Sequence, residues 1–223
     1  QGPVRAARRA ANGASVSSER PLFRGIAHEV FRAEVSVVKG SALVLIVEAA
    51  EVTKPEIAKS LDRECVKVLG HGESPKTINN GKLDLTYTGA RWSGPIAFEE
   101  AGLSPQDVDY ASIYDSFTIT VLETIEDLGF CEKGKGGAFV SDGNLISGQG
   151  KLPFNTDGGG LCNNHPVNRG GLTKVLEAVR QLRNEAHPQV QVDNCQIALA
   201  HGTGGSIGTR MGSSTVLLGR ADS

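Results

Sequence analysis

Two histidines stand in glycine-rich segments whose composition suits a catalytic site. His165 ends the segment that begins at Asn155, and His201 opens the sequence His-Gly-Thr-Gly-Gly. An imidazole held in such a turn can act as a general base or donate a proton toward a developing oxyanion. Glycine lets the backbone approach a ligand closely, and seventeen of the 28 glycines lie between Gly134 and Gly219. We therefore expect a site built largely from backbone rather than a set of turns.

A third segment with chemical potential is Tyr114-Asp115-Ser116-Phe117, which stands between an expected strand and an expected helix. Polar residues at such junctions gather at one edge of an open α/β sheet. Asp115 is also a good N-cap for a helix that starts at position 116. One side chain can cap a helix and line a site together, so we retain both functions for Asp115.

The same segments contain residues that could be considered for cysteine, zinc or dinucleotide chemistry. Cys162 lies three residues before His165, but this spacing does not guarantee a Cys–His nucleophile, and we favour a small buried filler. A zinc site from His165, His201 and Asp157 lacks HxH or HExxH spacing, so we expect no metal. The glycines after His201 follow the pattern GxGGxxG and precede an expected strand. A dinucleotide fold needs a helix there, so we exclude it.

Strands alternate with helices along the chain, which predicts an α/β fold with at least partly parallel pairing. The expected strands are Val35–Val38 with Ala42–Val47 (one bent strand or a tight hairpin), Cys65–Leu69, Tyr110–Tyr114, Ile197–Ala200 and Thr215–Leu218. The expected helices are 55–61, Gly89–Glu100, a capped turn at Ser104–Asp107, Ser116–Leu128 and a helix from 170 with the apolar stripe Leu172, Val175, Leu176, Val179 and Leu182. Residues 71–85 read as a loop, and 134–160 as a loop with short strands.

Composition excludes several classes of protein. The 223 residues carry a net charge of −2, which gives no global electrostatic reason to bind nucleic acid. The longest aliphatic run, Ala42 to Val47, is far too short for a membrane span. Four cysteines without a CxxC pair argue against a zinc ribbon or a disulfide scaffold and favour a reduced, cytoplasmic protein. We expect residues 1–22 to be a tail or linker and 23–223 to form one domain.

Taken together, these segments resemble the C-terminal half of the thiolase superfamily. Tyr114-Asp115-Ser116-Phe117 falls where thiolases carry Asn-Glu-Ala-Phe, Asn155 to Pro166 resembles their Asn-x-x-Gly-Gly…Gly-His-Pro motif, and His201 to Gly205 resembles a final motif that replaces Cys-x-Gly. The branch looks like the acetyl-CoA acetyltransferases and the lipid-transfer or sterol-carrier-protein thiolases. Asn163-Asn164 departs from the residues that usually precede His-Pro, and Lys39 stands where an Asp is common. The resemblance implies a thiolase-like α/β fold with a mixed five-stranded sheet covered by helices.

The resemblance also implies an acyl-CoA C-acyltransferase that performs Claisen condensation or thiolysis. Its substrate would be a coenzyme A thioester, with no bound cofactor and no metal. The acyl-accepting cysteine of the family lies in an N-terminal half, which we expect a further segment or a partner chain to supply. The implied site residues are His165 to lower the pKa of that thiol, His201 as acid/base on the second substrate, Asp115 and Tyr114 to orient water or an oxyanion donor, and Asn155, Gly159, Gly204 and Gly205 for substrate binding.

Two alternatives stay open at this point. Some thiolase-like proteins of this branch act as retro-aldol lyases on acyl-CoA side chains, together with a small zinc-ribbon and OB-fold protein. They are expected to rely on tyrosines, so Tyr114 keeps this alternative open. The other alternative is a non-catalytic, thiolase-derived subunit that binds a partner. A half-thiolase would expose the surface that its other half covers, so we expect a homo- or hetero-oligomer.

Overall fold

The computed structural model describes residues 30–40, 43–53, 55–58, 60, 64–76, 83–165, 170–205 and 212–220. Its strands are β1 (Val30–Gly40), β2 (Leu43–Thr53), β3 (Val66–Pro75), β4 (Tyr110–Ile113), β5 (Ile197–Gly204) and β6 (Gly212–Arg220). Its helices are α2 (Pro55–Ala58), α3 (Ala90–Ala101), α4 (Thr118–Asp127), α5 (Gly136–Phe139), α6 (Gly159–Cys162) and α7 (Gly170–Leu182), with a 3-10 turn at Pro105–Asp107. The tail predicted at 1–22 lies outside the described residues.

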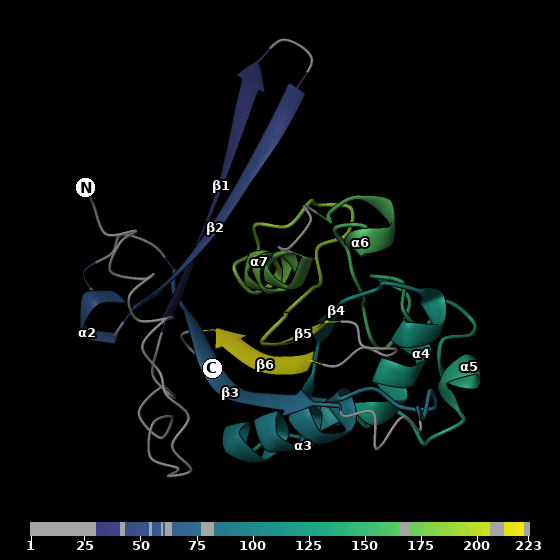
Figure 1. The fold of residues 1–223 in the computed structure, drawn as a ribbon. Coiled ribbons are helices and arrows are strands. Elements are labelled where there is room, and N and C mark those ends of the chain that lie inside the picture. The colour runs from purple at the N-terminus through teal and green to yellow at the C-terminus, as the bar shows by residue number, and fades with distance from the viewer. Residues whose placement is uncertain are drawn as a thin grey trace.

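The described strands form one mixed sheet in the order β2-β1-β3-β6-β5-β4. β4 and β5 run parallel, and the other neighbouring pairs run antiparallel, so the predicted α/β class and partly parallel pairing are confirmed. The count of five strands is wrong, because the described sheet has six. The hairpin β1–β2 is joined to β3 by only two residue pairs, Val30 with Lys67 and Phe31 with Val66. The other four strands form the part that the helices cover, and the hairpin extends away from it (Figure 1).

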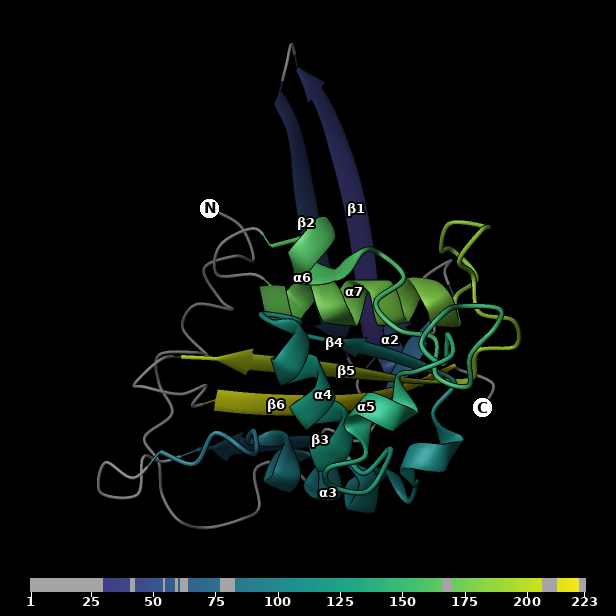
Figure 2. The same cartoon turned by 90° about the vertical axis from the view of Figure 1, so that its right-hand side faces the viewer.

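Helices cover both faces of these four strands. α7 packs on β5 and β4, while α3 packs on β3 and β6 from the opposite side (Figure 1). Figure 2 shows α4 and α5 in front of the strands. Successive residues of a strand point to opposite faces. Accordingly Ala198 and Ala200 of β5 are buried with Leu176 of α7, whereas Leu199 is buried with Ile125 of α4. The core is therefore two apolar layers, one on each side of the sheet.

Most of the predicted elements are confirmed, with different bounds. Of the two alternatives, one bent strand or a hairpin, β1 and β2 form the hairpin. The helices α3, α4 and α7 and the capped turn lie where they were predicted. β3 continues to Pro75 because it pairs with β6 as far as Gly212. The loop predicted to start at residue 71 therefore starts after Pro75. β5 likewise does not end at Ala200 but continues through His201, since it pairs with β6 along its whole length.

Two shorter segments also differ from the prediction. α2 covers only four residues, and the segment 134–160 contains the short helix α5 where short strands were expected. In that segment only Phe154 makes a strand-like bridge among the described residues, to Ala111 of β4. None of the helices described here combines the length and the apolar composition that crossing a membrane requires.

Two glycines let β3 and α3 approach closely. A Cβ at Gly70 would stand 2.2 Å from the carbonyl oxygen of Ala97, and one at Gly72 would stand 2.1 Å from that of Ser93. No side chain fits at such distances, so both residues must lack a Cβ. The backbone of α3 therefore lies directly on β3.

We predict that Gly70→Ala lowers the free energy of unfolding by about 2 to 4 kcal/mol, because the added methyl group must push α3 away from the sheet. Urea denaturation measures this change. The matched control is Gly137→Ala in α5, where a Cβ would meet no atom within 4 Å. A Gly70→Ala protein as stable as Gly137→Ala would contradict the close packing described here.

Candidate functional site

The loop before α6 is joined to the end of β4 by the carboxamide of Asn155. The Ile113 amide donates to Asn155 Oδ1 at 2.9 Å, and Asn155 Nδ2 donates to the Ile113 carbonyl at 2.8 Å. The backbone of this loop also pairs with Ala111, through the Ala111 amide to the Pro153 carbonyl at 3.0 Å and the Asn155 amide to the Ala111 carbonyl at 3.1 Å. Asn155 is buried and has φ of 41°, a left-handed conformation that asparagine tolerates. The loop thus starts at a fixed point beside the strand end.

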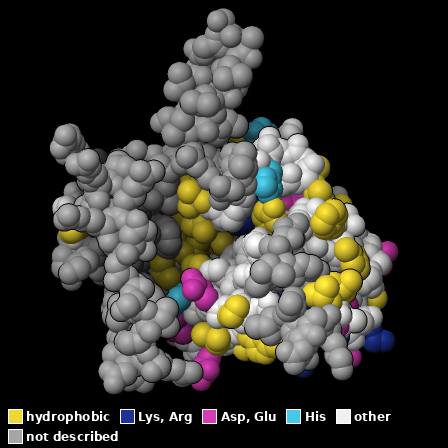
Figure 3. All heavy atoms as spheres, viewed as in Figure 1, with side chains coloured by type: hydrophobic (Ala, Val, Ile, Leu, Met, Phe, Trp, Pro, Cys, Tyr) yellow, Lys and Arg dark blue, Asp and Glu magenta, His cyan; other side chains and the backbone are white. Residues whose placement is uncertain are grey.

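Tyr114, the next residue after β4, meets the ring of His165. The Tyr114 amide donates to the His201 carbonyl at 2.9 Å, which continues the β4–β5 ladder by one residue. The Tyr114 hydroxyl is in hydrogen-bond contact with His165 Nε2, and the ring centroids lie 5.4 Å apart at 56°. His165 is exposed and Tyr114 half-buried. Figure 3 shows a histidine side chain at the surface in the region of α6 and α7.

Gly170, the first residue of α7, makes the contact between these two rings possible. A Cβ at Gly170 would stand 2.7 Å from Tyr114 Cε2 and 3.1 Å from His165 Cδ2. Any larger residue would therefore displace one ring or the other. Gly170 was not predicted from the sequence, although the pair of glycines at the predicted start of a helix was a usable signal.

Asp115 holds α6 rather than α4, so the predicted cap of α4 is wrong. Its Oδ1 accepts from the Gly160 amide at 2.7 Å and its Oδ2 from the Leu161 amide at 3.2 Å. A Cβ at Gly159 would stand 2.2 Å from Asp115 Oδ2, so this glycine makes room for the carboxylate. The N-cap of α4 is Phe117, in extended conformation and without a side-chain cap. Asp115 lies two residues too early to reach the first amides of α4.

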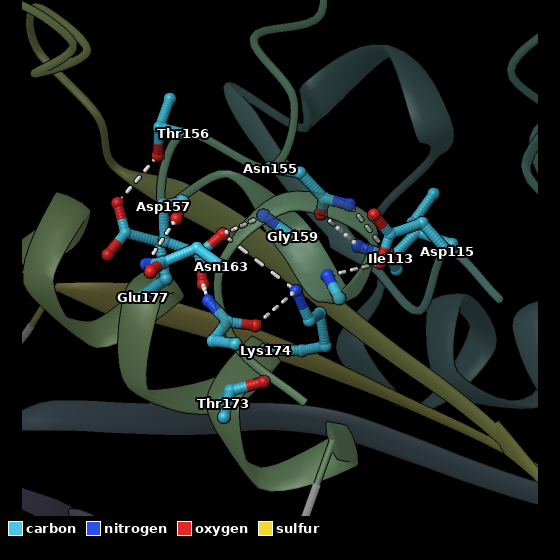
Figure 4. A network of polar contacts seen from close by, with 12 residues as sticks. Ile113, Asp115, Asn155, Thr156, Asp157, Gly159, Asn163, Thr173, Lys174 and Glu177 are labelled. Atoms are coloured by element: carbon cyan, nitrogen blue, oxygen red, sulfur yellow. Dashed lines mark hydrogen bonds and ion pairs between the residues drawn. The ribbon is translucent and has the colours of Figure 1, made fainter. Parts of the chain in front are cut away.

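The segment between Asn155 and His165 closes on the side chain of Asp157. Asp157 Oδ1 accepts from the Gly159 amide at 3.0 Å, Asn164 Nδ2 donates to Oδ2, and Asn163 Nδ2 donates to the Asp157 carbonyl at 2.9 Å. Figure 4 shows these contacts together with Lys174 of α7. The two asparagines that depart from the family pattern therefore both bind Asp157, Asn164 at its carboxylate and Asn163 at its backbone carbonyl. Lys174 was missed from the sequence, where it reads as one residue of an amphipathic helix.

His201 lies in β5 with its ring on the other side of the sheet. It pairs with Ile113 and so shares that residue's face, which is covered by α3 and α4. Its Nδ1 is 2.8 Å from Thr215 Oγ1, which is in turn 2.9 Å from Ser93 Oγ of α3. Nε2 is buried and has no partner among the described residues. Burial lowers the pKa of His201 to about 3, so the ring is neutral near neutral pH.

The structure therefore brings part of the predicted site together. Tyr114, Asp115, Asn155, Gly159 and His165 form one cluster, whereas the ring of His201 lies apart from it and shares only a backbone bond. Gly204 and Gly205 follow in exposed positions at the end of β5, and a Cβ at Gly204 would meet no atom within 4 Å. Their assigned functions, and that of His201, stay predictions.

The burial of Cys162 differs from the sequence prediction. Cys162 is exposed at the end of α6, so its assignment as a buried filler is wrong. Cys195 is buried, and burial raises the pKa of its thiol to about 12. In the part of the chain that the structure describes, no three His, Cys, Asp or Glu residues gather as metal ligands would.

We predict that Asp115→Ala speeds hydrogen exchange at the amides of Gly160 and Leu161, because each loses its acceptor. Loss of the buried carboxylate is expected to lower the free energy of unfolding by about 1 to 3 kcal/mol. The amides of Thr118 and Thr120 in the first turn of α4 serve as the internal control. Faster exchange in α4 instead of α6 would mean that Asp115 caps α4 after all.

We also predict an acid sensitivity that arises from His201. In the unfolded chain a histidine has a pKa near 6.5, whereas burial holds it near 3 in the folded protein. As the pH falls below about 6.5, the unfolded state binds a proton that the folded state does not, so stability decreases. Between pH 8 and 5, wild type should lose about 2 kcal/mol more unfolding free energy than His201→Gln. Equal losses in urea titrations at the two pH values would place a protonatable, solvated ring at position 201.

Comparisons with known proteins find a family model, curated relatives and a solved structure that match this chain. The family described as "thiolase C-terminal domain-like" matches residues 72–220. An acetyl-CoA acetyltransferase of Methanothermobacter thermautotrophicus is 38% identical over 128 residues, which are 57% of this chain and 32% of that protein. The benzoylsuccinyl-CoA thiolase subunit BbsB of Thauera aromatica is 39% identical over 165 residues, 73% of this chain and 42% of that subunit. A solved Ltp2-ChsH2(DUF35) aldolase has a TM-score of 0.66 at 28% identity, covering 78% of this chain and 44% of that one.

The chain spans about a third to two fifths of the length of these curated relatives. The family match runs from within β3 to the end of β6, so it contains β4, the loop up to His165, α7 and the whole of β5. The resemblance inferred from the three motifs is thereby confirmed. This chain belongs to the thiolase family and carries its C-terminal domain.

Proposed function

We propose that this chain supplies the proton-transferring half of a thiolase-type active site that transfers acyl groups from coenzyme A thioesters. The observation that carries the proposal is the exposed imidazole of His165 in contact with the Tyr114 hydroxyl. An exposed imidazole can meet a thiol brought by another part of the protein, and a neighbouring phenol can donate to an oxyanion. The acetyltransferase and thiolase names of two relatives, at 38% and 39% identity, support the same reaction class.

In the proposed reaction, the nucleophilic cysteine lies outside this chain, in the part of the relatives that it does not span. His165 takes the proton from that thiol, and the thiolate attacks the carbonyl carbon of the thioester. Coenzyme A leaves as its thiolate and takes the proton back from the imidazolium, which leaves an acyl-enzyme. The Tyr114 hydroxyl donates to the carbonyl oxygen while it carries negative charge. The second substrate, a thioester carbanion or the thiol of coenzyme A, then accepts the acyl group.

His201 is proposed as the acid/base for the second substrate. Burial keeps the ring neutral near neutral pH, but a pKa of about 3 makes it a weak proton acceptor, so the bound substrate would have to raise this pKa for His201 to act as a base. With Nδ1 donating to Thr215 Oγ1, the lone pair on Nε2 is available for a proton. The burial of Nε2 means that the second substrate would have to reach the α3 side of β5. This requirement makes the proposal for His201 depend on a rearrangement that the proposal for His165 does not need.

A second candidate is a retro-aldol lyase, which the Tyr114–His165 contact favours specifically. A phenol hydrogen-bonded to an imidazole can pass its proton to the ring and then remove the proton of a β-hydroxyl group. The carbon–carbon bond breaks, a carbonyl product leaves, and the enolate of the thioester is protonated by the imidazolium through the phenol. The aldolase among the solved structures, at 28% identity, supports this candidate.

Partner binding is proposed under either reaction. Large apolar side chains near the cluster are more than half exposed, namely Phe117 at 62%, Ile119 at 57% and Leu161 at 54%. Exposed apolar residues around a site are typical of a surface that another chain or segment covers. By name, one relative is a subunit and the solved aldolase has two components. A non-catalytic, partner-binding subunit remains the third candidate and is decided by the test that follows.

We predict that His165→Ala and Tyr114→Phe separate the two reactions in the complete protein. Acyl transfer is measured as exchange of labelled coenzyme A into acetyl-CoA, and lyase activity as cleavage of a β-hydroxyacyl-CoA. An acyltransferase should lose exchange by about 100- to 10,000-fold in His165→Ala and much less in Tyr114→Phe. A lyase should show no exchange and lose cleavage in Tyr114→Phe.

The Cys195 thiol is buried away from the cluster, so Cys195→Ala serves as the control for both assays. Activity that persists unchanged in His165→Ala and Tyr114→Phe would exclude this cluster as the catalytic site. A complete protein without either activity would leave the partner-binding subunit.

A further inference from the structure

Lys174 of α7 is a buried cation inside the loop network rather than at its surface. Its side chain is 1% exposed, and that of Asp157 is 7% exposed. Lys174 Nζ lies 3.8 Å from Asp157 Oδ1 and donates to Asn164 Oδ1 at 3.4 Å (Figure 4). Removing both charges from water is costly, and apolar side chains of similar volume often stabilise a fold as well or better. Stability alone therefore does not explain why a lysine occupies this position.

The Lys174 ammonium completes a set of polar contacts around the Asp157 carboxylate. The carboxylate accepts from the Gly159 amide through Oδ1 and from the Asn164 side chain through Oδ2. Asn164 in turn places its own oxygen on Lys174. The three side chains form a closed arrangement of carboxylate, carboxamide and ammonium, so moving one of them leaves a buried polar group without its partner.

This arrangement ends at the residue next to His165. Asn164 directly precedes His165, and Lys174 lies on the same helix as Gly170, which contacts the rings of both His165 and Tyr114. α7 therefore reaches the site twice, with the backbone of Gly170 against the rings and with the ammonium of Lys174 against the residue before the imidazole. A loop tied to the helix at both points has little freedom to turn His165 away from Tyr114.

We propose that Lys174 is a positioning residue that, through Asp157 and Asn164, holds the His165 imidazole on the Tyr114 hydroxyl. The effect on turnover rests on the proposed function, whereas the effect on the ring contact does not. The proposal also gives a reason for the departure at Asn163-Asn164, since a glycine before the histidine could not bridge the carboxylate and the ammonium. Small displacements of a catalytic group are enough to slow a reaction by about 100-fold.

The ring contact can be measured by NMR in the complete protein. The chain has five histidines, so the ring Cε1–H signal of His165 can be assigned by comparison with His165→Gln. Two variants break the arrangement. Asn164→Ala removes the link without changing any charge, and Lys174→Met with Asp157→Asn removes both buried charges together, so that neither is left alone. Lys151→Met, the loss of an exposed lysine outside the network, is the matched control.

We expect both test variants to lose the nuclear Overhauser effect between the Tyr114 and His165 rings and to shift the His165 signal, while Lys151→Met resembles wild type. In the assay that proves active, kcat should fall by about 100-fold with KM little changed. Both test variants retaining the ring contact and the wild-type His165 signal would overturn the proposal. Loss of the contact in a protein that has no thioester activity would support the positioning of His165 and refute the proposed function instead.

Discussion

The two hydrogen bonds between the Asn155 carboxamide and the backbone of Ile113 are the contact on which the site depends. β4 is the last strand of the sheet, and an edge strand presents backbone groups that need partners. Residues 153–155 satisfy that edge through the backbone of Ala111 and through the carboxamide. The loop that carries His165 thus leaves from a fixed point next to Tyr114. Without this junction, neither Asp115 nor α7 would meet the loop at the positions described.

After Asn155, buried polar side chains hold the loop in place. The His165 ring stays exposed and is available to react. Asp115 binds the first amides of α6, and Asp157 binds the side chains that precede His165. Both carboxylates are satisfied by groups of the chain itself, which is the condition under which a buried polar group stabilises a single conformation. His165 is held at the surface by its neighbours, whereas His201 is enclosed in the apolar layer below α3. The two histidines that look alike in sequence therefore occupy chemically different environments.

The sequence correctly predicted those features of the fold that depend on a local residue pattern. The apolar stripe around Leu176 predicted α7, and the alternation of elements predicted the α/β class. It failed where long-range pairing decides the outcome. β5 continues past Ala200 because β6 pairs with it, and Asp115 turns to α6 because its acceptor geometry fits amides 45 residues away. Lys174 could not be recognised as part of a network, since its partners come from a loop whose path the sequence does not reveal.

In the proposed function, this chain positions the proton-transferring groups, while the acyl-accepting thiol comes from a further segment or a partner chain. Peptide mapping by mass spectrometry after incubation with acetyl-CoA tests it most directly. We expect an acetyl group on a cysteine other than Cys65, Cys131, Cys162 and Cys195, and we expect its loss in His165→Ala. An acetyl group on Cys162, the exposed thiol at the end of α6, would contradict it and would place the nucleophile within this chain.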